Sequence, residues 1–206
     1  MNLTSLRMAA AVFVLSAAVL PVAQAVTLDS VQAHGNTVST DFFAADLIAA
    51  DIGFNADTDV TLNMTVDGTE LLSQVAFNAV LDQLQAGAAF NQIWLTLSGG
   101  ATFTAIGQTE TLNALGTPSV SLSNGNQTAL ISLSVPESAV FVGNPFGTLM
   151  QDWRIGLQGL STGQQFSLSV SAVPEPASLA LTLAGLGLLG FSGLSGRMGR
   201  KARTQA

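Results

Sequence analysis

Residues 58–66 read Thr-Asp-Val-Thr-Leu-Asn-Met-Thr-Val, and residues 165–171 read Gln-Phe-Ser-Leu-Ser-Val-Ser. Both segments alternate apolar and polar residues with a period of two, as a strand does when one face lies in a core and the other is exposed. The same pattern recurs at 92–98, 101–106, 120–122, 130–135 and 153–157. We therefore expect an all-β fold, namely an antiparallel β-sandwich of the jelly-roll or immunoglobulin-like kind.

Turn residues separate these segments. Gly99-Gly100 stands between 92–98 and 101–106 and predicts a hairpin, and Asn124-Gly125 predicts a second hairpin. Pro136 is expected to end the strand at 130–135, because proline lacks the backbone N–H that a ladder needs.

Two segments do not follow the strand pattern clearly. Residues 40–52 contain several alanines between a possible cap at Thr40 and a possible stop at Gly53, and residues 71–85 place apolar side chains at helical spacing. We predict a short helix or an irregular segment in each, although Val75 and Phe77 also fit a strand.

Charge and composition restrict the function of the central region, residues 26–172. This region is long enough for one domain with its own core. It contains twelve acidic residues and a single basic one, Arg154, which leaves a net charge of −11. Such a domain would repel nucleic acids and anionic membrane surfaces. The chain has no cysteine, so disulfides and cysteine-ligated metal sites are excluded.

Few residues are candidates for chemistry. His34 is the only histidine, so a Ser-His-Asp triad would have to include it, and one histidine cannot build a histidine-based zinc site. Asn55, Asp57 and Asp59 have the spacing of calcium ligands, but the EF-hand pattern fails, because Val60 and Val66 stand where it needs glycine and glutamate. Asp57 and Asp59 therefore stay as weak candidates for an irregular Ca²⁺ site.

The two tryptophans, Trp94 and Trp153, could form a sugar-stacking platform. Both lie in apolar strands, so packing in the core is the favoured role for each. The acidic residues are scattered and do not form an obvious pair for glycoside hydrolysis. We therefore expect no catalytic residues and no cofactor.

The N-terminal segment has the features of a secretory signal peptide over residues 1–25. Arg7 precedes an apolar run at 8–22, which ends in Ala23-Gln24-Ala25. Small residues at Ala23 and Ala25 fit the A-x-A pattern that signal peptidase cleaves. The apolar run of about 15 residues is shorter than the roughly 20 that a membrane-spanning helix needs.

The C-terminal segment predicts a transmembrane helix over residues 177–196. These twenty residues carry no charge, and as a helix they would cover about 30 Å, the thickness of the hydrocarbon core. The Gly-x-Gly-x-x-Gly pattern at 185–190 lies inside this span and lacks the strand and the acid of a nucleotide site. A basic cluster follows, which would stay on the cytoplasmic side: Arg197, Arg200, Lys201 and Arg203.

Residues 173–178 precede this span and read Val-Pro-Glu-Pro-Ala-Ser. A Pro-Glu-Pro motif, an apolar helix and a basic cluster in this order, over residues 173–203, resemble the PEP-CTERM sorting signal of Gram-negative bacteria. The resemblance implies recognition and cutting by exosortase, a transpeptidase-like membrane protease. Pro174, Glu175 and Pro176 would be the recognition residues, and the basic cluster would hold the tail in the membrane. The resemblance implies no activity for the central domain, because such tails occur on many unrelated domains.

We therefore expect an exported protein, anchored through its C-terminal helix with the domain outside, and then placed at the cell surface or secreted into the extracellular or biofilm matrix. The expected role of the central domain is structural or interactive and not enzymatic. The expected partners are signal peptidase, an exosortase-like protease, the membrane and, as a further candidate, exopolysaccharide; nucleic acid is excluded. A carbohydrate- or Ca²⁺-binding module is the alternative, and a secreted hydrolase is a weaker one.

Overall fold

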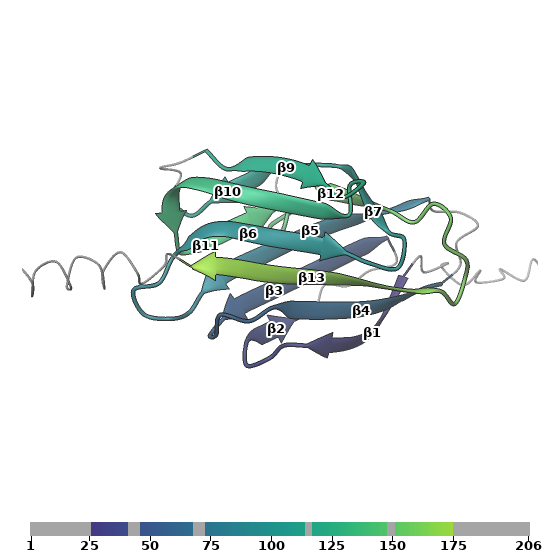
Figure 1. Ribbon diagram of the computed structural model, residues 1–206, viewed down its shortest axis with the longest axis horizontal. Coiled ribbons are helices and arrows are strands. Elements are labelled where there is room, and N and C mark those ends of the chain that lie inside the picture. The colour runs from purple at the N-terminus through teal and green to yellow at the C-terminus, as the bar shows by residue number, and fades with distance from the viewer. Residues whose placement is uncertain (1–25, 41–45, 68–72, 114–116, 148–150, 175–206) are drawn as a thin grey trace, which may run out of the picture.

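The computed structural model of the protein describes residues 26–40, 46–67, 73–113, 117–147 and 151–174, which contain thirteen β-strands in two sheets. In Figure 1 the six-stranded sheet lies in front of the seven-stranded sheet. The apolar side chains buried between them form one core. The predicted all-β sandwich is confirmed.

The six-stranded sheet is antiparallel throughout. Strand β4 follows the predicted alternation, because Val60, Leu62, Met64 and Val66 are all fully buried while the residues between them are not. In spatial order its strands are β1 (Val26–Gln32), β4 (Val60–Val66), β13 (Gln165–Pro174), β6 (Phe90–Leu97), β10 (Thr128–Glu137) and β9 (Ser119–Ser123).

The seven-stranded sheet is mixed. Strands β3 (Leu47–Phe54) and β5 (Gln74–Gln83) pair in parallel, so the prediction of a purely antiparallel sandwich is wrong at this pair. Strand β12 (Trp153–Gly156) pairs with both β5 and β7 (Thr102–Ala105). The other five strands are, in spatial order, β2 (Thr37–Ser39), β3 (Leu47–Phe54), β5 (Gln74–Gln83), β11 (Ala139–Val142) and β8 (Thr109–Thr111).

The two segments predicted as short helices or irregular stretches contain the parallel strands. Strand β3 begins at Leu47, inside 40–52, and continues to Phe54, and β5 occupies most of 71–85. In β5 five consecutive residues, Val75 to Ala79, are buried, so both faces of the strand are covered. A strand buried on both faces loses the alternation by which strands are recognised in a sequence, and this explains the wrong prediction.

The outer side of β5 is covered by the segment that leads from β11 to β12. Asn78 of β5 donates a hydrogen bond to Oδ1 of Asp152 at 3.2 Å, and the backbone N–H of Asn144 donates to the same oxygen at 2.9 Å. Asp152 therefore connects this crossing segment to a central strand.

The predicted hairpin at Gly99-Gly100 is wrong, because β6 and β7 lie in different sheets. Both glycines have positive φ, +72° and +99°, and they turn the chain from one sheet to the other. The hairpin at Asn124-Gly125 is confirmed: it joins the paired strands β9 and β10, and both residues have positive φ, as a tight hairpin turn requires.

The prediction that Pro136 ends a strand is also wrong, because β10 continues to Glu137. The regular pairing of β10 with β6 is interrupted between Ser132 and Glu137. Pro136 lies inside this irregular stretch, where its missing N–H does not remove a regular hydrogen bond between the two strands.

Large aromatic side chains fill the centre of the core. Phe54 of β3 and Phe90 of β6 belong to opposite sheets and meet edge to face, with ring centroids 5.6 Å apart. Trp153 contacts Phe103 at 5.6 Å and Phe77 at 6.4 Å in the same manner. The Phe54–Phe90 pair joins the two sheets, whereas the contacts of Trp153 join neighbouring strands of the seven-stranded sheet.

Candidate functional site

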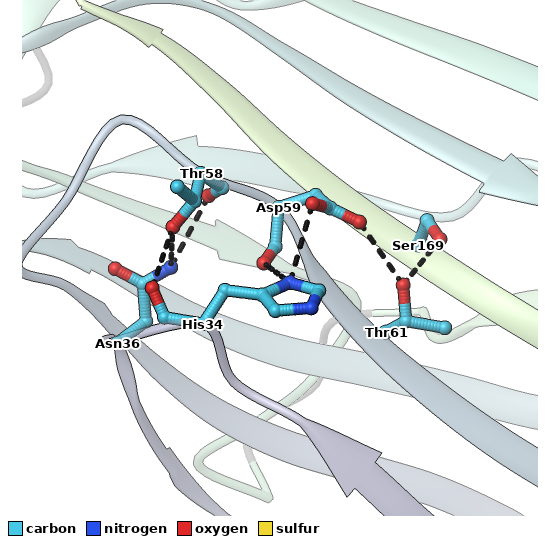
Figure 2. Close-up of polar contacts among 6 residues, drawn as sticks. All are labelled: His34, Asn36, Thr58, Asp59, Thr61 and Ser169. Carbon is cyan, nitrogen blue, oxygen red and sulfur yellow. Dashed lines mark hydrogen bonds and ion pairs between the residues drawn. The ribbon is translucent and has the colours of Figure 1, made fainter.

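The only histidine lies in the turn between β1 and β2, close to the loop before β4 (Figure 2). Its Nδ1 atom is 3.1 Å from the backbone oxygen of Asp59 and 3.4 Å from the Oδ1 atom of that residue. Both side chains are 47% exposed, so this ion pair adds little to stability. Within the described residues, Asp59 is the hydrogen-bonding partner of the His34 ring, and no serine joins them as a catalytic triad would require.

Neighbouring side chains hold this turn against the loop before β4. Asn36 donates from Nδ2 to the backbone oxygen and the hydroxyl of Thr58, each at 3.1 Å, and Thr58 donates its hydroxyl to the backbone oxygen of His34 at 2.9 Å. The Oδ1 atom of Asn36 accepts the N–H groups of Asn55 and Ala56. Because the bonds of Asn36 join the turn to residues 55–58, the cluster holds the turn in place.

The two carboxylates considered for calcium have different partners. Asp59 contacts His34 and accepts the Thr61 hydroxyl at 3.1 Å, whereas Asp57 accepts from Nε2 of Gln85 at 3.5 Å. The described part of the chain contains no group of three or more histidine or acidic side chains placed to hold a metal ion. Calcium binding at Asp57 and Asp59 stays a prediction.

The two tryptophans lie in different places. Trp153 is fully buried, and its indole N–H donates to the backbone oxygen of Gln108 at 3.2 Å, so its predicted core role is confirmed. Trp94 is only partly buried and alternates with the buried residues Ile93 and Leu95, so it projects from the outer face of the six-stranded sheet. Core packing is therefore wrong for Trp94, and the two rings cannot share one platform.

The outer face that carries Trp94 also contains a hollow of about 350 Å³ at the β1, β4 and β13 side of the sheet. Ser98 and Ser167 bond to each other through their hydroxyl oxygens at 2.7 Å, and Asn63 donates to the Ser30 hydroxyl at 3.1 Å. Hydroxyl and amide groups dominate the lining, which is formed by Asp29, Ser30, Gln32, Asn63, Ser98, Gln165, Phe166 and Ser167.

A second hollow, of about 270 Å³, lies at the edge of the seven-stranded sheet beside Asp51 and Asp82. Partial burial raises the pKa of Asp82 above its ordinary value of 3.8, and the negative charge of Asp51 raises it further.

Asp82→Asn is expected to stabilise the protein at pH 7 by about 0.5 kcal/mol, a small gain because solvent screens a partly exposed carboxylate. A raised pKa means that ionised Asp82 destabilises the folded state above that pKa, while below pH 3.8 the carboxyl is protonated in both states. The gain should therefore disappear near pH 3. Urea unfolding at the two pH values measures it, and Asp67→Asn is the exposed control. A gain that persisted at pH 3 would contradict the electrostatic cause.

Sequence reasoning missed a buried acid at the end of β10. Glu137 is 1% exposed, and its Oε2 accepts from Nδ2 of Asn113 at 2.8 Å. Among the described residues, its Oε1 and the hydroxyls of Thr109 and Thr111 are buried without a hydrogen-bond partner. The sequence signal nearest to Glu137 is Pro136, which indicates that the strand pairing is interrupted here. It does not indicate that the next side chain is a buried acid.

The sorting motif begins where the domain ends. Pro174 is the last residue of β13 and lies opposite Phe90 of β6. Among the residues that the structure describes, no helix is long and apolar enough to cross a membrane. The predicted helix at 177–196 lies outside those residues, as do Ala23, Ala25, Glu175, Pro176, Arg197, Arg200, Lys201 and Arg203.

Comparison with known proteins gives one match. Residues 172–201 match the family described as "PEP-CTERM protein-sorting motif". No curated protein and no solved structure matches the chain. The C-terminal region of this chain therefore carries a PEP-CTERM sorting motif, which implies export, membrane-associated sorting and processing by an exosortase.

Proposed function

We propose that the protein is delivered to the cell surface or the extracellular matrix, where its central domain acts as a non-catalytic interaction module. In this proposal residues 1–25 are removed as a signal peptide, and residues 177–196 hold the chain in the membrane until an exosortase cuts near Pro174, Glu175 and Pro176. The sorting motif at residues 172–201 is the observation that carries the proposal.

The position of the motif fits this sequence of events. Because β13 ends at Pro174, a cut after the motif leaves all thirteen described strands on the released side. The domain would therefore keep its complete core after processing.

Glu175→Ala is expected to block processing, because it removes the only charge of the Pro-Glu-Pro motif. Mass spectrometry of the exported wild-type protein should find a C-terminus close to Pro176, whereas the variant should keep the full tail and stay in the membrane fraction. Glu110→Ala, which changes an exposed glutamate of β8, is the matched control and should be processed normally. An exported wild-type protein that still ends beyond Arg203 would contradict the proposal.

A further inference from the structure

The outer face of the six-stranded sheet is polar, and its central strands β4, β13, β6 and β10 place no charged residue at their regularly paired outward positions. Outward residues alternate with the core residues of each strand, and on β4, β13, β6 and β10 the regularly paired outward positions hold mainly serine, threonine, asparagine and glutamine. The strands lie side by side at the front of Figure 1. Each hydroxyl can donate and accept a hydrogen bond, which is the pattern that a sugar hydroxyl also presents.

Trp94 is the single aromatic residue at these outward positions of the described strands. It lies opposite Leu130 on β10 and opposite Ser171 on β13, near the middle of the sheet. Its partly exposed indole offers a rigid, flat apolar surface among polar groups. A sugar ring has a matching apolar C–H face between its hydroxyl groups.

A continuous series of hydroxyl groups leads from Trp94 to the hollow. Ser98 follows Trp94 by four residues, about 13 Å along an extended chain, and both project to the same side. Between them lies a row in which Thr61 and Ser169 share a hydrogen bond at 2.7 Å (Figure 2). An aromatic ring and several orienting polar groups at this separation suit an extended chain of linked sugars better than one small molecule.

The charges near this face favour neutral polysaccharides over anionic ones. Arg154, the only base among the described residues, lies on β12 in the other sheet. Asp29 lines the hollow, and Asp59, the partner of His34, bonds to Thr61, so carboxylates outnumber basic groups near this face. A polysaccharide that carries uronic acid or sulfate groups would be repelled, while a neutral one would not.

A second copy of the chain fits this face less well. Stable interfaces between proteins have an apolar centre that is rich in aromatic residues. Here Trp94, Leu130 and Val173 are surrounded by hydroxyl and amide groups, which leaves little apolar area to bury.

We propose that the outer face of the six-stranded sheet binds a neutral polysaccharide, with Trp94 stacked on a sugar ring and Asn63, Ser98 and Ser167 bonded to sugar hydroxyls. This site deepens the proposed function, because it names the partner class of the interaction module. It does not depend on processing of the C-terminal motif, so the two proposals fail separately.

Affinity electrophoresis of the purified protein tests the site, with a neutral β-glucan, a neutral α-glucan and a galactomannan in the gel, and alginate as the anionic counterpart. At least one neutral polysaccharide should retard the protein and alginate should not. Trp94→Ala should weaken binding tenfold or more, while Trp94→Phe should keep part of it. Phe146→Ala, at an exposed aromatic residue between β11 and β12, is the matched control and should bind normally.

Three results would overturn the proposal. The first is no retardation by any of the three neutral polysaccharides, and the second is retardation by alginate alone. The third is equal binding by wild type and by a Trp94→Ala variant whose melting temperature is unchanged. Light scattering is run in parallel, and a dimer that Trp94→Ala dissociates would assign this face to self-association instead.

Discussion

Trp153→Ala is expected to lower the free energy of unfolding by about 3–5 kcal/mol, the range for removing a large aromatic side chain from a core. Trp153 is fully buried and contacts both Phe77 and Phe103. Alanine would leave a cavity between these rings, and the backbone oxygen of Gln108 would lose the indole N–H that it accepts at 3.2 Å. Both losses act in the same direction.

The other tryptophan supplies the control for this experiment. Trp94→Ala removes the same side chain from a partly exposed position, so the expected loss is about 1 kcal/mol or less. Guanidinium unfolding followed by circular dichroism measures both variants without relying on tryptophan fluorescence. Similar losses at the two positions would contradict the assignment of Trp153 to the core and Trp94 to the outer face.

Gly99→Ala is expected to cost about 3 kcal/mol. The φ of +72° alone costs an alanine about 1–2 kcal/mol, because L-residues are disfavoured in the left-handed region. A Cβ atom at this position would also lie 2.5 Å from the backbone oxygen of Gln165 and 2.8 Å from the Cα of Phe166. Backbone cannot move aside as a side chain can, so β6 and β13 would have to separate locally.

Gly87→Ala separates the two causes of that loss. Gly87 has a similar φ of +77°, but a Cβ atom there would meet nothing within 4 Å. Its expected cost is therefore the backbone part alone, about 1–2 kcal/mol. Thermal melting of the two variants measures the difference, and equal costs would show that the contact with β13 is unimportant.

The sequence predicts most of the six-stranded sheet because that sheet has one buried and one exposed face. Val60 to Val66 alternate in the sequence as they alternate in burial. Strand β5 was not predicted, because the segment around Asp152 covers its outer side and removes the polar half of the pattern. The wrong hairpin has a similar origin: Gly99-Gly100 indicates a turn, but local sequence does not say which sheet the chain enters next.

The polar face was even harder to predict. Its members come from strands far apart in the sequence, and only the register that places Ser98 beside Ser167 and Thr61 beside Ser169 brings them together. The alternation within β6 could have placed Trp94 on the other face of the sheet from Ile93 and Leu95, because successive residues of a strand point to opposite faces. The sorting motif was the easiest feature to find, because all of its parts are contiguous in the sequence.

Strand β13 is the last of the described strands, yet it lies in the interior of its sheet, between β4 and β6. In a chain that is exported N-terminus first, the β1–β4 half and the β6–β10–β9 half of that sheet cannot join until residues 165–174 have emerged. The sorting motif, residues 172–201, overlaps the end of this strand and continues beyond it. Completion of the fold and arrival of the tail at the sorting machinery are thus nearly simultaneous. A chain interrupted before β13 would lack both its closing strand and its sorting motif, so an incompletely folded domain could not enter the sorting route that the motif implies.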